Sequence, residues 1–157
     1  MERKLSTFEL TLRQRPYLKS PSATTQGDRH YIDFMIDGQS LAELTRYDLV
    51  SVLCREWVSE QREKSVRRLL GEESADFPHD RRSLLVCPNC GDLGCGAVSI
   101  VLSLSNNAVR WQDFGYQNNY EPEIRGEHLK RLGPFEFDLD DYKSKLIRAL
   151  DMLKASQ

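Results

Sequence analysis

The alternation of apolar and polar residues in the second half of the chain is the feature that most constrains its fold. The segment 97–104, AVSIVLSL, places apolar residues at every second position, which is typical of a strand with one buried face. The turn-forming residues SNN follow at 105–107, and the alternation resumes in 108–114. The sequence therefore predicts an antiparallel hairpin.

Four further segments are expected to be strands. The same period of two recurs in 7–15 and 31–38, so each is expected to bury one face. The apolar run SLLVC at 83–87 favours a buried strand, and PFEFD at 134–138 a short one. The segment 47–57 fits either a strand or a helix.

Helix signals are also present. Ser40 precedes Glu43 with the spacing of a capping box, which predicts a short helix. A thin apolar stripe in 58–70 predicts a second helix that ends at Gly71. Asp138 is placed to cap a third, over 139–156, whose leucines recur every three or four residues.

The order of these elements predicts the fold class. Strands and helices do not alternate regularly, so a doubly wound parallel sheet is not expected. We predict an α+β fold, with a mainly antiparallel sheet and helices packed on one face. With 157 residues, the chain is expected to form a single domain over 1–157.

Composition narrows the function classes. The net charge of −2 gives no electrostatic reason to expect nucleic-acid or membrane binding. No apolar run approaches the roughly 18 residues of a membrane span, and the first residues do not resemble a signal peptide. We therefore expect a cytoplasmic protein with reduced thiols. The polar stretch 20–28 is expected to be an exposed loop.

The segment CPNCGDLGCG, residues 87–96, carries three of the four cysteines. The two-residue spacing of Cys87 and Cys90, with Cys95 close behind, suits a tetrahedral zinc ion. A closed site would need a fourth ligand, for which Cys54, His79 and His128 are the candidates. The alternatives are a glycine-rich turn with buried sulfur atoms, or a thiol–disulfide redox site.

We expect the glycine-rich turn, with reduced, mostly buried thiols and no stoichiometric metal. Only three cysteines lie close together in the sequence, so a closed zinc site must recruit a distant ligand. The glycines after Cys90 do not begin a helix, whose N-terminus would lower a thiol pKa for redox work. Zinc held by Cys87, Cys90 and Cys95 remains the alternative, and no other cofactor is expected.

A second candidate site follows the predicted hairpin. The stretch RWQDFGYQNNY, residues 110–120, mixes aromatic rings with amides and one carboxylate. Rings of this kind contribute contact area at a low entropic cost in binding surfaces. The alternative is core aromatics followed by a polar loop. The expected binding residues are Trp111, Asp113, Phe114, Tyr116, Asn118 and Tyr120.

The second half of the chain resembles a family of small, uncharacterised bacterial proteins. The resemblance covers roughly residues 70–150 and rests on three blocks: C-P-x-C-x-D-L-G-C-G-A-V, W-x-D-F-G-[YW]-x-N-x-Y and G-P-F-x-F. Such proteins are often labelled oxidoreductases, but no flavin or nicotinamide motif accompanies the blocks. The resemblance implies a shared site or structural hub at Cys87, Cys90, Asp92, Gly94, Cys95, Trp111, Asp113, Phe114 and Asn118.

These observations favour a binding protein over an enzyme. The sequence contains no phosphate loop, nucleophile elbow or dinucleotide fingerprint. The leading hypothesis is a non-enzymatic bacterial cytosolic protein that binds a protein partner, such as a toxin-neutralising immunity protein, by analogy of size and class. The alternative is a zinc-binding or thiol-redox protein centred on Cys87, Cys90 and Cys95.

Overall fold

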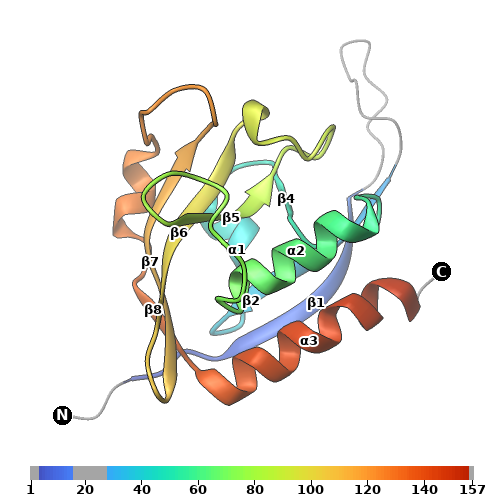
Figure 1. Ribbon diagram of the computed structural model, residues 1–157, viewed down its shortest axis with the longest axis vertical. Helices are drawn as coiled ribbons and strands as arrows, with labels where there is room; N and C mark the ends of the chain where they lie inside the picture. Colours follow the sequence, from blue (N-terminus) through green and yellow to red (C-terminus); the bar gives the residue numbers. More distant parts are fainter. Residues whose placement is uncertain (1–3, 16–27, 156–157) are drawn as a thin grey trace.

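The computed structural model describes residues 4–15 and 28–155, which form two antiparallel sheets and three α-helices (Figure 1). The first sheet has the order β1 (Phe8–Arg15), β2 (Arg29–Ile36), β3 (Gln39–Ser40). The second has the order β4 (Val50–Ser51), β5 (Arg81–Val86), β6 (Ala97–Leu104), β7 (Ala108–Gln117), β8 (Phe135–Asp138). The helices are α1 (Leu41–Thr45), α2 (Ser59–Leu69) and α3 (Leu139–Ala155), with 3-10 helices η1 (Leu93–Cys95) and η2 (Glu127–Arg131). The predicted α+β class is confirmed.

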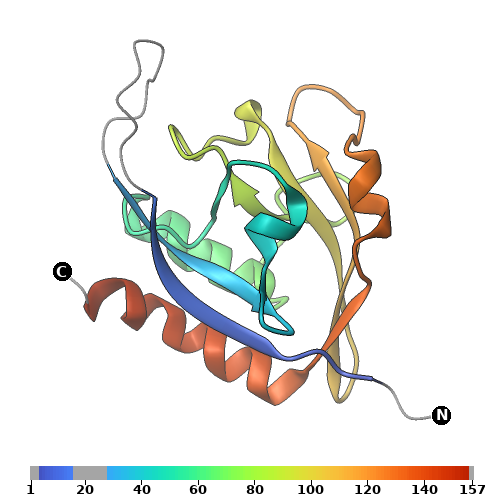
Figure 2. The same cartoon turned by 180° about the vertical axis from the view of Figure 1, so that it is seen from behind.

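The two sheets are joined at both margins. The backbone N–H of Ser6, just before β1, donates to the carbonyl of Glu136 in β8 at 2.7 Å. At the other margin the N–H of Ile32 in β2 donates to the carbonyl of Leu53, after β4, at 2.9 Å. In the reverse view of Figure 2, β1 and β2 lie in front of the second sheet. Two linked sheets thus enclose the core where a single sheet was expected.

The core is centred on aromatic rings from both sheets and from α3. The indole of Trp111 in β7 meets Phe8, Phe34 and Phe137 edge to face, with centroids 5.3–5.6 Å apart. Its Nε1–H donates to the hydroxyl of Tyr142 at 3.2 Å. Trp111 is fully buried, so its expected place on an exposed binding rim is wrong. Because side chains alternate between the two faces of a strand, the Trp111 ring lies on the inner face of β7, which packs against the first sheet.

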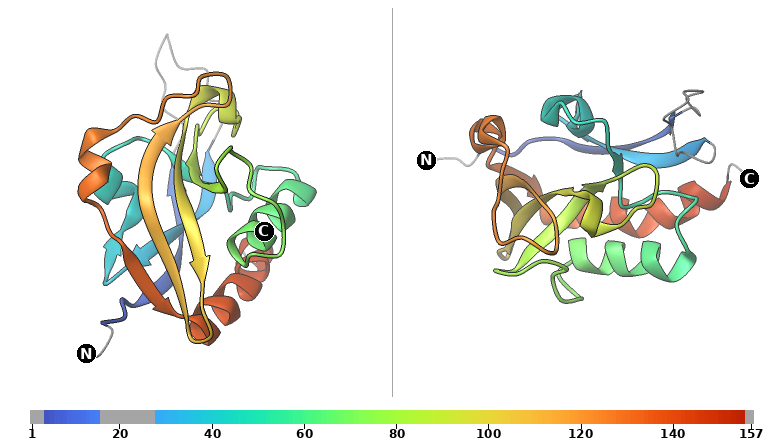
Figure 3. Two further views of the ribbon diagram at one scale, coloured as in Figure 1. Left: turned by 60° about the vertical axis from the view of Figure 1, so that its left-hand side comes forward. Right: turned by 90° about the horizontal axis from the view of Figure 1, so that it is seen from above.

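The helices α1 and α3 begin where the sequence indicated. The N–H of Asp141 donates to the carboxylate of Asp138 at 2.9 Å, which caps α3 as predicted. The N–H of Glu43 donates to the Ser40 hydroxyl at 3.3 Å, which caps α1. α2 and α3 lie side by side along the molecule, and the short α1 lies on the opposite side (Figure 3).

The predicted hairpin forms, but β7 contains a bulge. Ser99 pairs with Gly115, and the next pair is Val101 with Gln112, so two residues of β7 oppose one residue of β6. The first bulged residue, Asp113, has a φ of +55°. The bulge changes which side chains face outward in the second half of β7.

No helix within residues 4–15 and 28–155 is long and apolar enough to cross a membrane. The polar loop expected at 20–28 lies outside the described residues, except for Asp28. The ambiguous segment 47–57 contains the two-residue strand β4 and no helix.

Candidate metal centre

The cysteine segment forms the connection between β5 and β6. Cys87 directly follows β5, and Cys95 is the last residue of η1. The connection folds back on itself because the N–H of Gly91 donates to the carbonyl of Cys87 at 2.9 Å. Asp92 then caps η1 by accepting the N–H of Gly94 at 3.0 Å. The turn therefore returns Cys95 to the neighbourhood of Cys87 and Cys90.

The three sulfur atoms converge on one point. All three Sγ atoms lie within 4.8 Å of one another, and the pair Cys90–Cys95 is 3.1 Å apart. Three thiolates around one zinc ion, with Zn–S bonds of about 2.3 Å, would be about 3.8 Å apart. The N–H of Asp92 points at the Cys90 sulfur at 3.4 Å. The separation in a zinc site thus lies between the 3.1 Å of the Cys90–Cys95 pair and the 4.8 Å within which all three sulfur atoms lie.

Contrary to our expectation, the thiols of the cluster are not mostly buried. All four cysteines are free thiols; Cys90 and Cys95 are exposed and Cys87 is half-buried. Only Cys54 is buried. The expectation treated the sulfur atoms as small apolar groups packed in a turn, but the loop projects beyond the ends of β5 and β6 (Figure 1). The sulfur atoms therefore face one another and solvent.

An arginine and a tryptophan from other parts of the chain hold this loop in place. Arg29, at the start of β2, donates to the carbonyls of Pro88 at 2.6 Å and Asn89 at 3.1 Å. Its guanidinium lies over the ring of Trp57, 5.2 Å from the centroid. A β-carbon at Gly91 would lie 3.0 Å from that ring. Sequence reasoning missed Arg29 because a contact across about 60 residues leaves no local signal.

Tyr116 supports the far side of the loop. Its hydroxyl donates to the carbonyl of Cys95 at 3.3 Å, and its ring stacks on Tyr47 with centroids 4.5 Å apart. Tyr116 was expected on the binding rim. Because the ring is half-buried and stacked, it is also part of the support of the cysteine loop.

The proximity of the thiols changes their acidity. The hydrogen bond to Cys90, followed by burial and the nearby sulfur atoms, raises the pKa of Cys95 to about 12. Two adjacent thiolates repel each other, so the crowding disfavours the thiolate form of Cys95 in the metal-free protein. A cation among the sulfur atoms removes this repulsion and stabilises the thiolates.

The expected fourth ligands do not join the cluster. Cys54 is buried elsewhere and donates to Glu56 at 3.3 Å, and the Nε2 atom of His128 lies 2.8 Å from the carbonyl of Thr45. His79 is an exposed loop residue before β5. Within the described part of the chain, the group of convergent ligand atoms consists of the three thiols. The cluster therefore offers three thiol ligands.

The remaining residues of the expected binding rim do not form one surface. Phe114 is buried, which corrects its expected exposure, because it packs edge to face on Phe135 at 5.7 Å. Asp113 is exposed at the bulge. The side chain of Asn118 accepts the N–H groups of Tyr120 and of the residue after it, at 3.2 and 2.9 Å, and so shapes the loop after β7. Tyr120 is 70% exposed.

No protein-family model matches this chain, and neither a curated protein nor a solved structure is significantly similar to it. The resemblance based on the cysteine and aromatic blocks stays a prediction. The assignment of a function thus depends on the geometry of the site.

Proposed function

We propose that this chain is a zinc-binding protein in which Cys87, Cys90 and Cys95 hold one Zn²⁺ ion. The observation that carries the proposal is the convergence of three free sulfur atoms within 4.8 Å. The proposal replaces our expectation of a metal-free turn, because a turn that only packed its sulfur atoms would bury them.

The donor set favours zinc. Thiolates select soft or borderline ions, and zinc with cysteine ligands adopts a tetrahedral geometry. Zinc sites often contain the C-x-x-C spacing of Cys87 and Cys90. The N–H of Asp92 near the Cys90 sulfur is the kind of contact that stabilises a bound thiolate. Hard ions such as Mg²⁺ and Ca²⁺ prefer oxygen ligands.

Thiol–disulfide catalysis fits the site less well. Redox-active cysteines have a lowered pKa, commonly because a helix begins at the nucleophile. The residues after Cys90 form a turn and the three-residue η1, and the pKa of Cys95 is raised. In a zinc complex the same crowding is favourable, since the ion neutralises the thiolates.

The bound ion would have two effects. It would fix the connection between β5 and β6, because its three ligands come from both ends of that loop. It would also leave one coordination position for water or for a ligand from outside the chain, as in zinc sites with three protein ligands. The exposure of Cys90 and Cys95 keeps that position accessible.

Metal content of single-cysteine variants tests this proposal. The protein is purified without chelator, reduced, and loaded with a small excess of zinc before gel filtration. We expect one zinc per chain, and at least a tenfold lower zinc content in Cys90→Ser and Cys95→Ser. Cys54→Ala is the matched control, and it should keep its zinc. A wild-type chain that emerges without zinc, or serine variants that retain it, would refute the proposal.

A protein-binding role is a second candidate, supported by the exposure of Tyr120 in the loop after β7. In that loop Asn119 lies near the cysteine cluster: its side-chain oxygen is 3.5 Å from where a β-carbon at Gly94 would be. Tyr120→Ala should weaken capture of a partner from a bacterial lysate without changing the melting temperature. Equal capture of a partner by the wild type and by Tyr120→Ala would count against a protein-binding role. The more specific role of an immunity protein stays a prediction.

A further inference from the structure

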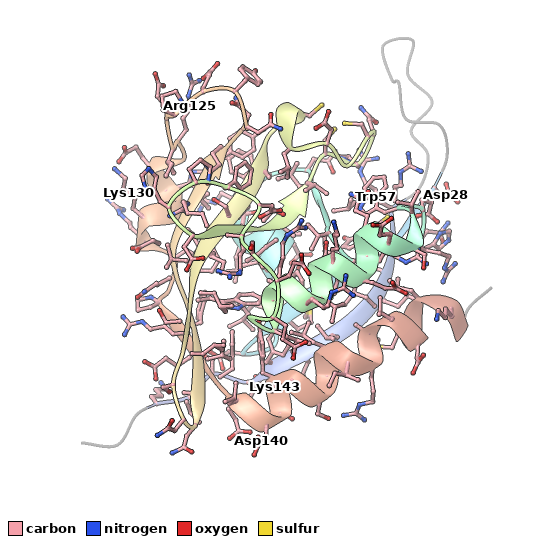
Figure 4. The ribbon with its side chains drawn as sticks, in the orientation of Figure 1. Asp28, Trp57, Arg125, Lys130, Asp140 and Lys143 are labelled. Atoms are coloured by element: carbon pink, nitrogen blue, oxygen red, sulfur yellow. The ribbon has the colours of Figure 1, made fainter. Side chains whose placement is uncertain are left out.

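A second site lies on the outer face of β7, where a pocket of about 370 Å³ opens between this strand and the segment that leads to β8. Its walls combine apolar and cationic side chains. Figure 4 shows Lys130 projecting from η2 at this edge of the molecule. The lining includes Arg81, Arg110, Asp113, Phe114, Ile124 and Lys130.

The base of the pocket contains a buried guanidinium. Arg81 is only 5% exposed, and its Nε donates to the side chains of Gln117 at 3.0 Å and Ser99 at 3.1 Å. Its Nη2 donates to the backbone carbonyls of Ser99 and Asp113. Every one of these acceptors is neutral. A buried charge is normally paired with an opposite charge.

The third nitrogen of this guanidinium, Nη1, forms no hydrogen bond within the described residues. Within residues 4–15 and 28–155, Arg81 donates through Nε and Nη2 only and forms no salt bridge. Burial lowers the pKa of Arg81, and the nearby charge of Asp113 opposes this shift only in part. The other cations of the pocket do have partners, since Arg110 lies 3.6 Å from Glu136 and Lys130 2.9 Å from Glu127. An anion in the pocket would therefore complete the surroundings of Arg81.

The backbone around Arg81 is shaped to form this pocket. The bulge at Asp113 turns its carbonyl toward the guanidinium, at the cost of a left-handed φ of +55°. Such strained positions concentrate at functional sites. At Gly115 a β-carbon would lie 2.2 Å from the Cγ2 atom of Ile124. The absence of a side chain at Gly115 lets Ile124 close one wall of the pocket.

We propose that this pocket binds a small carboxylic acid with a short apolar body. The carboxylate would accept hydrogen bonds from Nη1 of Arg81 and attract the ammonium of Lys130, while the apolar body would contact Phe114 and Leu132. A monoanion fits better than a phosphate dianion, because the carboxylate of Asp113 also lines the pocket and repels additional negative charge.

Binding of phenylacetate, measured by calorimetry and by NMR chemical-shift changes, tests the proposal. Phenylacetamide, which has the same shape without the charge, should bind at least tenfold more weakly. Phenyl phosphate should also bind more weakly. If phenylacetate and its amide bind equally, or if phenylacetate does not bind, the carboxylate site is refuted. Tighter binding of phenyl phosphate would overturn the preference for a carboxylate.

Two variants locate the binding. Lys130→Ala alters an exposed residue and should weaken phenylacetate binding about threefold to tenfold, while Arg81→Lys should weaken it at least tenfold because the planar fork is lost. Lys143→Ala, on α3 (Figure 4), is the matched control and should bind as the wild type does. Since Arg81→Lys affects a buried network, its melting temperature is measured as well. Unchanged binding in Lys130→Ala and in a folded Arg81→Lys protein would overturn the proposal.

Discussion

The hydroxyl of Tyr116 donates a hydrogen bond to the backbone carbonyl of Cys95 and occupies the space that a β-carbon on Gly96 would need. This contact joins β7 to the cysteine loop and fixes the position of the third sulfur atom. Through this contact, the aromatic block of the sequence supports the cysteine block.

A methyl group at Gly96 should therefore impair metal binding. In Gly96→Ala the new β-carbon would lie 2.1 Å from the Tyr116 hydroxyl, at a residue with a φ of +103°. We expect the zinc affinity to fall at least tenfold in competition with a chromophoric chelator. Gly38→Ala is the control, because Gly38 also has a positive φ but nothing lies within 4 Å of its β-carbon position. An affinity equal to that of the control would contradict this account of the loop.

Loss of the Arg29 side chain should also weaken zinc binding. Arg29→Ala removes two hydrogen bonds to the loop carbonyls of Pro88 and Asn89 and the contact with Trp57. Groups that orient metal ligands typically contribute about tenfold to hundredfold in affinity, and we expect a decrease in that range in the same competition assay. Arg67→Ala, on α2, is the control. If both variants bind zinc equally well, the loop does not depend on Arg29.

The inward face of α3 should be essential for stability. Leu146 is fully buried, whereas its neighbour Ile147 is 62% exposed. Leu146→Ala should lower the free energy of unfolding in urea by about 2–5 kcal/mol, and Ile147→Ala by less than about 0.5 kcal/mol. A loss below about 0.5 kcal/mol for Leu146→Ala would mean that this face of α3 is not packed.

Cys54 should behave differently from the other cysteines. Burial raises the pKa of its thiol to about 12, and the side chain is out of reach of solvent. In the folded, metal-free protein at pH 8, Cys54 should therefore react with a thiol reagent much more slowly than the exposed Cys90. The raised pKa also means that the folded state keeps a proton that the unfolded state loses above about pH 9. Its contribution to stability is thus present below pH 9 and decreases between pH 9 and 12.

The free energy of unfolding, measured between pH 9 and 12 for the wild type and for Cys54→Ala, tests the contribution of this thiol to stability. The decrease should be smaller in Cys54→Ala than in the wild type. Rapid labelling of Cys54 in native protein, or identical pH profiles of the two proteins, would contradict the burial of this thiol.

Local patterns were sufficient to predict the longer strands and helices, but not the short strand β4 or how the elements pack. The 97–114 alternation and the Asp138 cap gave the hairpin and α3 because both depend on neighbouring residues. The same alternation did not reveal that Trp111 faces a second sheet, since that sheet comes from distant strands. A bulge then changed the exposure pattern around Asp113, which a strict period of two cannot anticipate.

In the candidate sites too, local features could be predicted from the sequence, and features that depend on packing could not. The spacing of the cysteines correctly indicated that Cys87, Cys90 and Cys95 are able to approach one another. Their exposure depends on the loop extending beyond the ends of β5 and β6, which spacing does not determine. Arg81 gave no sequence signal at all, because its neutral acceptors lie on β6 and β7. Its buried environment is a product of sheet packing.

X-ray absorption spectroscopy of the zinc-loaded protein is the most direct test of the proposed centre. The edge and fine structure report the number, type and distance of the ligands. We predict about three sulfur atoms at about 2.3 Å and one nitrogen or oxygen atom at about 2.0 Å, with the sulfur number reduced or the zinc lost in Cys95→Ser. A first shell of only nitrogen and oxygen atoms would contradict the three-cysteine centre, and a shell of four sulfur atoms would contradict its open fourth position.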